Sequence, residues 1–214
     1  IIQAIYRSNF VLFGLPLTVS VFGDVASSVA AMVVTVVITI YNTTSVVILE
    51  MFNSEGKTDV KTILVNVVKN PLLQGAVVGL LFFFLGIHVP KSLLTPIAAF
   101  ADATSPVALF VLGGTLHFNA IRGNMKYLVP ALSLKLLVLP AVMLALGYAF
   151  GLRDLELFLL VAIYGTPVAA ASYPMAQNMG GDGELAGQFV VISTVVAVGT
   201  LFGWIFFMKS VGLI

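Results

Sequence analysis

The chain has 214 residues, of which 60% are hydrophobic and only 9% are charged, and its formal net charge is +1. Soluble domains carry about 25% charged residues, so this composition excludes a soluble globular fold and indicates an integral membrane protein. The small net charge gives no basis for nucleic-acid binding. The lack of cysteine excludes disulfides and thiolate metal sites, and we expect neither a metal ion nor a cofactor.

Long apolar runs without alternation predict helices, and a helix needs about 20 mostly apolar residues to span a bilayer. Seven stretches fit this requirement, so the sequence predicts an all-α polytopic membrane protein. Their predicted bounds are Ile1–Phe22, Val25–Phe52, Val67–Ile87, Leu93–Phe118, Tyr127–Phe150, Leu155–Asn178 and Leu185–Met208.

Two of these segments contain breaks. The first segment is interrupted between Asn9 and Pro16, and the sixth is interrupted between Tyr164 and Asn178, where Pro167 and Pro174 each remove a backbone donor. In hydrocarbon the freed backbone groups need partners, so a break persists only where protein or a water-filled cavity surrounds it. We therefore expect the chain to be organised around two broken helices that meet.

The basic residues predict how the segments are oriented, because lysine and arginine concentrate in cytoplasmic loops. With seven alternating spans, one face receives the larger share of them and is assigned as cytoplasmic. The two broken helices then run in opposite directions, which is typical of inverted repeats that meet at a midplane substrate site. The larger share comprises Arg7, Lys57, Lys61, Lys69, Arg122 and Lys126, against Lys91, Arg153 and Lys209.

A repeat of five helices accounts for this arrangement. Residues 67–214 are predicted to form one complete repeat, residues 1–52 the last two helices of a preceding repeat, and residues 53–66 the cytoplasmic loop between them. The chain begins directly inside an apolar segment, so we expect three further helices upstream of Ile1.

Short motifs follow one another in a characteristic order: Asn9-x4-Gly14-x-Pro16, Phe22-Gly23, Tyr41, Leu49-Glu50, Asn70-Pro71, Gly79-Leu80, Pro90, Ala101-Asp102-Ala103, Pro106-x-Ala-Leu-Phe110-x-Leu-Gly113, Lys135-x4-Pro140 and the sixth segment with its two prolines. Together they resemble the auxin efflux carrier family of transporters, within a superfamily similar to the bile acid:sodium symporters. The resemblance covers nearly the whole chain. It implies a ten-helix fold of two inverted five-helix repeats, whose broken helices cross at prolines.

The resemblance also assigns roles to individual residues. It implies that Pro16 and Pro174 are the crossing prolines and that Asn9 contacts the substrate. Thr166-Pro-Val-Ala stands where the plant carriers have Leu-Pro-Gln-Gly, and the loop 53–66 is far shorter than their cytoplasmic domain. Both departures indicate a bacterial-type member, similar to malate and organic-acid permeases and located in a prokaryotic cell membrane, and they argue against auxin as the substrate.

Two charged residues fall inside predicted spans, Asp102 in the fourth and Lys135 in the fifth. A charge at the bilayer centre costs at least about 2.5–3.5 kcal/mol on insertion scales, so such residues face the protein interior and mark functional sites by default. We expect Lys135 to attract a carboxylate or replace a bound cation, and Asp102 to carry a coupled proton. The alternatives are a structural Asp102–Lys135 ion pair, or a Lys135 that extends to the cytoplasmic surface.

Uncharged residues at the two breaks complete the predicted site. The free N–H groups of a broken helix favour an anion, and amide and hydroxyl side chains then fix its carboxylate. The alternative, for Asn42, Gln177 and Asn178 in particular, is hydrogen bonding between packed helices. The predicted substrate-binding residues are Asn9, Gly14, Pro16, Asn42, Pro167, Ser172, Tyr173 and Pro174.

These features predict a secondary transporter that moves a small organic anion, such as a dicarboxylate, by alternating access around crossed helices. A channel is one alternative, although the sequence contains no selectivity-filter motif. An intramembrane enzyme is another, but Met179-Gly-Gly-Asp182 matches only part of an aspartyl protease motif, and we predict no catalytic residue. We further expect a proton or sodium ion as coupling ion, a lipid bilayer around the protein, a homodimer and no nucleic-acid partner.

Overall fold

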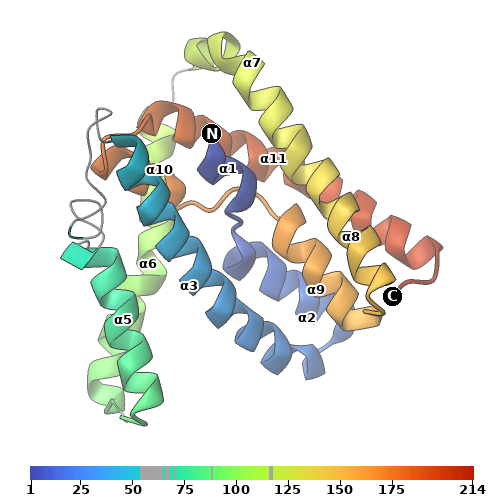
Figure 1. Cartoon of the computed structure of the whole chain (residues 1–214), viewed down its shortest axis with the longest axis horizontal. Coiled ribbons are helices and arrows are strands. Elements are labelled where there is room, and N and C mark those ends of the chain that lie inside the picture. The colour runs from blue at the N-terminus through green and yellow to red at the C-terminus, as the bar shows by residue number, and fades with distance from the viewer. Residues whose placement is uncertain (54–64, 66–67, 70, 88, 116–117) are drawn as a thin grey trace.

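The computed structural model is almost entirely helical in the residues that it describes (Figure 1). It describes residues 1–53, 65, 68–69, 71–87, 89–115 and 118–214. Within these ranges no β-strand is present, and extended backbone pairs only at a single isolated bridge. The predicted loop 53–66 lies almost wholly outside the described residues.

Helices occupy all the predicted segments. The breaks divide the first segment into α1, η1 and α2 and the sixth into α9 and α10, while a π-helical turn divides the fifth into α7, η2 and α8. The bounds are α1 Ile2–Tyr6, η1 Phe10–Gly14, α2 Leu15–Phe22, α3 Val25–Asn53, α5 Pro71–Phe84, α6 Lys91–Thr115, α7 Phe118–Ser133, η2 Leu134–Val138, α8 Leu139–Ala149, α9 Asp154–Gly165, α10 Ser172–Asn178 and α11 Gly183–Ser210.

Three of the described helices are long and apolar enough to cross a membrane: Val25–Phe52, Ala120–Ala149 and Gly183–Ser210. The predicted class, a helical protein with membrane-spanning helices, is therefore confirmed. The count of seven spans, the ten-helix fold and the inverted repeat stay predictions. Large apolar side chains such as Phe100, Phe110 and Phe202 are exposed on the helix surfaces, as expected where hydrocarbon replaces water as the surroundings.

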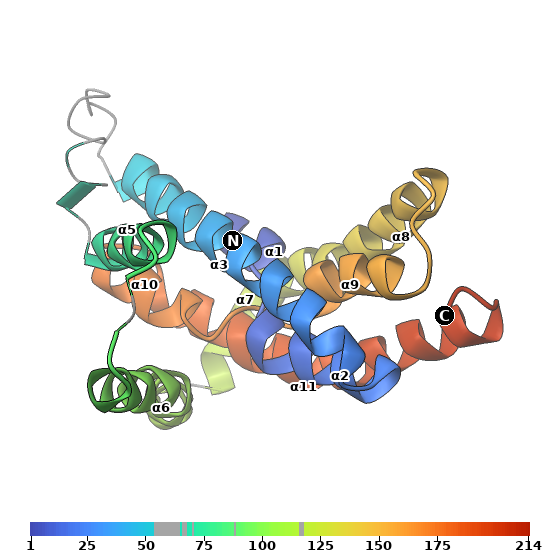
Figure 2. The ribbon, with the colours of Figure 1, turned by 90° about the horizontal axis from the view of Figure 1, so that it is seen from below.

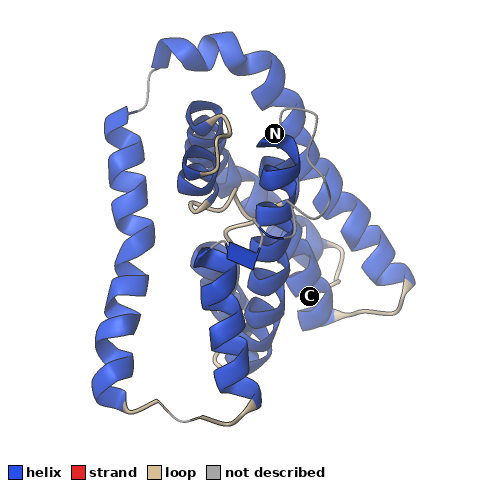
Figure 3. Cartoon of the chain, turned by 60° about the vertical axis from the view of Figure 1, so that its left-hand side comes forward, coloured by secondary structure: helices blue, strands red, loops and turns tan. Residues whose placement is uncertain are grey.

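The helices pack around the two broken segments. The pairs α2–α3, α8–α9 and α10–α11 are in contact, and α11 runs past η2 and α9 (Figures 1 and 2). Helices α5 and α6 lie at the edge of the molecule, where α5 contacts α3 and α6 contacts α10 (Figure 3). The buried core has two main clusters, one where α1 and α10 meet α7 and α11, and one where η1, α3 and α9 meet α8 and the end of α11.

Each π-helical turn lies just before a proline. Proline has no N–H and clashes with the carbonyl four residues earlier, so the turn before it widens into i→i+5 bonding. The Leu15 N–H accordingly donates to Phe10 before Pro16, and the Leu139 N–H donates to Leu134 before Pro140. Lys135 lies within the second of these turns and is buried.

The proline after η2 also leaves a carbonyl without its helical donor. That carbonyl belongs to Leu136, four residues before Pro140. The indole Nε1–H of Trp204 on α11 donates to it at 2.9 Å. A side chain from another helix thus satisfies the backbone group that the proline frees, as apolar surroundings require.

Candidate functional site

The two broken segments meet where both chains are extended. Arg7 ends α1 with φ −82° and ψ 123°, and Ser8 forms an antiparallel bridge with Val168. The Asn9 N–H donates to the Pro167 carbonyl at 2.7 Å. We call this pairing of residues 7–9 with residues 167–168 the crossing. At this point the two chains run in opposite directions.

The crossing is not at the prolines that the family resemblance indicated. Pro16 lies in the first turn of α2 and is exposed, and Pro174 is the third residue of α10. A helix tolerates proline in its first turn, where the missing N–H has no helical partner in any case. The pairing instead involves Pro167, which follows the end of α9.

The backbone groups freed by the second break are bound by side chains from three other helices. The Val168 N–H donates to Ser193 Oγ on α11 at 2.9 Å. The Tyr41 hydroxyl of α3 donates to the Ile163 carbonyl at 3.4 Å, and Lys135 Nζ donates to the Tyr164 carbonyl at 3.3 Å. The break is therefore enclosed and hydrogen-bonded rather than loose.

Lys135 lies directly behind the crossing. Its side chain is 0% exposed, and Nζ donates to Ser8 Oγ at 2.5 Å as well as to the Tyr164 carbonyl. A cation at this position also suits the C-terminal end of α9, where the helix dipole is negative. The alternative that Lys135 extends to the surface is wrong. The Asp102 backbone lies in α6, but its side chain is outside what the structure describes, so its predicted roles stay predictions.

Arg7 is the functional candidate that sequence reasoning missed. The sequence pattern predicts only a cytoplasmic surface charge, yet the Arg7 side chain is 4% exposed. Its Nη2 donates to Asn42 Oδ1 at 2.7 Å, and its Nη1 donates to Ser45 Oγ at 3.4 Å and contacts Met175 Sδ. The rule that singled out Lys135, an ionisable residue within a predicted span, applies equally to Arg7.

A cavity of about 710 Å³ lies beside the crossing, and we call it the crossing cavity. Its walls are residues 7–12 of the first broken segment, part of α3 with Asn42, Ala101 of α6 and the alanines at 169–171. Small side chains in the second break thus leave room beside the polar groups of the first. Of the predicted substrate-binding residues, Asn9 and Asn42 line this cavity.

The other predicted site residues lie elsewhere. Gly14 packs under the ring of Phe10, and a Cβ there would come within 2.1 Å of that ring. Ser172 is buried and lines a separate cavity of about 310 Å³. Tyr173 belongs to the core cluster around Phe189. The structure therefore gathers only part of the predicted set around one space.

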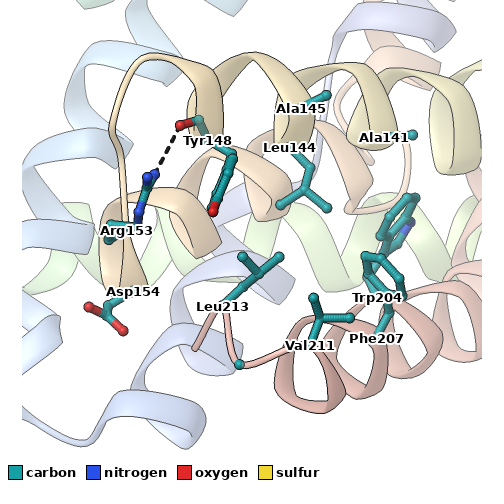
Figure 4. A pocket seen from close by; sticks show the side chains of 11 residues that line it. Ala141, Leu144, Ala145, Tyr148, Arg153, Asp154, Trp204, Phe207, Val211 and Leu213 are labelled. Carbon is teal, nitrogen blue, oxygen red and sulfur yellow. Dashed lines mark hydrogen bonds between the residues drawn. The ribbon is translucent and has the colours of Figure 1, made fainter.

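Another cavity, of about 770 Å³, lies away from the crossing between α8 and the C-terminal end of α11 (Figure 4). Its cation is Arg153, which is exposed and donates to the Tyr148 carbonyl at 2.9 Å. The guanidinium also lies 4.0 Å from the centre of the Tyr148 ring. Its charge is solvated and paired with an aromatic ring, so this cavity is a weaker candidate for binding a small anion.

Apolar helices surround a cavity whose mainly apolar wall contains an arginine and two asparagines, and two broken segments pair beside it, an arrangement typical of membrane transport proteins. Residues 1–205 match the model of a family described as "Membrane transport protein", and the chain belongs to this family, that of the auxin efflux carriers. The family prediction is thereby confirmed.

A protein of Rhizobium meliloti (strain 1021) named "Putative malonate transporter" is similar to this chain, with 29% identity over 147 residues. The similarity covers 66% of this chain and 44% of the relative, so the chain spans less than half of that protein's length.

Proposed function

We propose that this protein is a secondary transporter for small organic anions, with a dicarboxylate such as malonate as its substrate. The observation that carries this proposal is the crossing cavity, in which amide side chains of Asn9 and Asn42 lie beside extended, broken helices. Family membership supports transport rather than enzyme catalysis, and the name of the Rhizobium relative supports a dicarboxylate.

The proposed fold behind this activity is a pair of inverted five-helix repeats in a ten-helix prokaryotic membrane protein. Residues 1–52 belong to the first repeat and residues 67–214 form the second. The antiparallel pairing of Ser8 with Val168 supports this arrangement, since inverted repeats bring their broken helices together in opposite directions. Alternating access would expose the crossing cavity to each side of the membrane in turn.

Counterflow tests the transport mechanism. The protein, reconstituted in liposomes loaded with unlabelled malonate, is expected to accumulate external radiolabelled malonate, and the initial rate should saturate with concentration. A malonate flux that rises linearly without saturation would indicate a channel. Saturable uptake that neither malonate nor malate competes for would reject a dicarboxylate as the substrate.

The position of the site is tested by Asn9→Ala. Asn9 lines the crossing cavity, whereas Asn178 is exposed at the end of α10 and serves as the matched control. We expect Asn9→Ala to weaken malonate affinity about 5- to 10-fold, which is the loss of one hydrogen bond. Asn178→Ala should leave affinity unchanged. Equal affinities in both variants would place the site elsewhere.

Coupling to a proton through Asp102 is a separate part of the proposal. Asp102 neighbours Ala101, which lines the crossing cavity. We expect Asp102→Asn to abolish the pH dependence of malonate uptake, because an amide cannot carry the proton. Uptake with an unaltered pH profile in this variant would exclude Asp102 as the proton carrier and leave sodium as the coupling ion to test.

A further inference from the structure

The two buried cations near the crossing have different surroundings. Lys135 is fully enclosed and does not line the crossing cavity, and its Nζ is occupied by Ser8 Oγ and the Tyr164 carbonyl. Arg7, also buried, forms part of the cavity wall. Lys135 therefore holds the crossing together, while Arg7 belongs to the wall of the cavity beside it, next to its hydrogen-bond partner Asn42.

The guanidinium of Arg7 retains unused hydrogen-bonding capacity. It carries five N–H donors. Within the described residues its Nη2 donates to Asn42 Oδ1 at 2.7 Å, and its Nη1 approaches Met175 Sδ at 2.5 Å, so at least two of the five N–H groups have no acceptor there. Ser45 Oγ lies at 3.4 Å, and the sulfur of Met175 is a weak acceptor.

The charge of Arg7 is also uncompensated in the part of the chain that the structure describes. None of its contacts there is a carboxylate. A buried charge is normally paired, because leaving water costs several kcal/mol that only an opposite charge with good hydrogen bonds offsets. Arg7 thus has no opposite charge beside it, and some of its N–H groups lack acceptors. A cation of this kind in a cavity wall attracts an anion.

We propose that Arg7 binds a carboxylate of the transported substrate directly, with its guanidinium fork facing the crossing cavity. The inference rests on the proposed function and names the residue that recognises the anion. The planar guanidinium matches a carboxylate with two parallel hydrogen bonds, which a lysine ammonium does not. Asn42 acts as a positioning residue, because its Oδ1 orients Nη2.

The ligand class follows from this geometry. A small carboxylate supplies both the missing negative charge and the missing acceptors. A neutral amide of the same shape, such as malonamide, supplies acceptors without charge and should bind far more weakly. Selectivity for malonate over malonamide is therefore a property of Arg7 itself.

The test measures how much malonate raises the melting temperature (Tm) of the purified protein, together with the malonate Kd from calorimetry. Arg7→Gln is expected to weaken malonate binding about 10- to 100-fold, the range for a lost charge-assisted hydrogen bond, and to remove the preference over malonamide. Arg7→Lys, which keeps the charge without the fork, should bind with intermediate affinity. Arg153→Gln, which removes the exposed arginine of the other cavity, should match the unmodified protein.

The outcomes distinguish a failure of the proposed transport function from a failure of the proposed role of Arg7. If the unmodified protein shows no malonate-induced Tm shift, the proposed function fails. If the unmodified protein shows the malonate-induced Tm shift and Arg7→Gln shows the same shift in full, only the role of Arg7 is overturned. A purely structural ion pair, for example with Asp102, would give that second result: a lower starting Tm with an unchanged malonate shift.

A labelling experiment on the unmodified protein does not depend on any variant folding. Phenylglyoxal modifies arginines, and the chain contains only Arg7, Arg122 and Arg153. We expect malonate to protect Arg7 selectively, as measured by mass spectrometry. An Arg7 that is never labelled does not face the cavity, and an Arg7 labelled equally with and without malonate does not bind it. Either result overturns the inference.

Discussion

The hydroxyl of Ser193 is a sensitive point of the crossing, because it accepts the hydrogen bond of a backbone group that has no other partner in the helix. The Val168 N–H donates to Ser193 Oγ at 2.9 Å, and both residues are fully buried. Ser193→Ala removes this acceptor and leaves too little space for water to replace it. The N–H at the centre of the crossing is then unsatisfied.

The expected magnitude follows from that one group. An unsatisfied buried donor costs about 1–3 kcal/mol. The loss of the bond from Ser193 Oγ to the Val190 carbonyl adds little, because that carbonyl already has a helical donor. An opening equilibrium shifted by 1–3 kcal/mol corresponds to amide exchange about 5- to 150-fold faster.

Hydrogen–deuterium exchange measured on peptides covering residues 166–172 reads out this local opening. The matched control is Thr194→Val, since the Thr194 hydroxyl donates to the same Val190 carbonyl but accepts no bond from the crossing. Exchange in these peptides should accelerate in Ser193→Ala and stay unchanged in Thr194→Val. Equal exchange in the two variants would refute the claim that Ser193 holds the second break closed.

Three further substitutions test the packing around the crossing, each by thermal melting in detergent, with about 2–4 °C expected per kcal/mol for a chain of this size. Gly14→Ala should destabilise by about 1–3 kcal/mol, because the new Cβ would lie 2.1 Å from the buried Phe10 ring; an unchanged midpoint would mean that the ring is free to move. Trp204→Phe should cost about 1–2 kcal/mol by orphaning the Leu136 carbonyl, and a neutral effect would show that this carbonyl finds another donor. Lys135→Ala should cost at least about 2 kcal/mol through a cavity and two lost donors, so a midpoint at or above that of the parent would contradict its role in holding the crossing.

The helices and the existence of the breaks could be predicted from sequence, because both follow from local chemistry. Apolar runs of sufficient length specify helices in a membrane protein, and the proline-rich stretch around Pro167 cannot continue one. The expectation that the two broken segments run in opposite directions rests on the parity of the predicted spans, of which they are the first and the sixth, and the antiparallel pairing of Ser8 with Val168 agrees with it.

The position of the crossing could not be predicted, because prolines do not mark it uniquely. Pro16 and Pro174 both lie in first turns, where a helix accepts them, and the extended residue Ser8 has no sequence signature. The same limit applies to Arg7, whose place near the start of a segment is equally compatible with a surface charge. Only its contacts with Asn42 and its 4% exposure distinguish the two.

The hydrogen bonds of the crossing constrain how a transport cycle can proceed. The Asn9 N–H donates to the Pro167 carbonyl, and Lys135 joins Ser8 to the end of α9. Separating the two broken segments would therefore leave buried polar groups on both of them without hydrogen-bond partners. A motion that opens the cavity by pulling these two segments apart therefore has a high free-energy cost. We expect the crossing to move as one unit while the rest of the fold rearranges around it. The crossing cavity, with Arg7 in its wall, would then open to each side of the membrane in turn, and the hydrogen bond from Arg7 to Asn42 would stay intact.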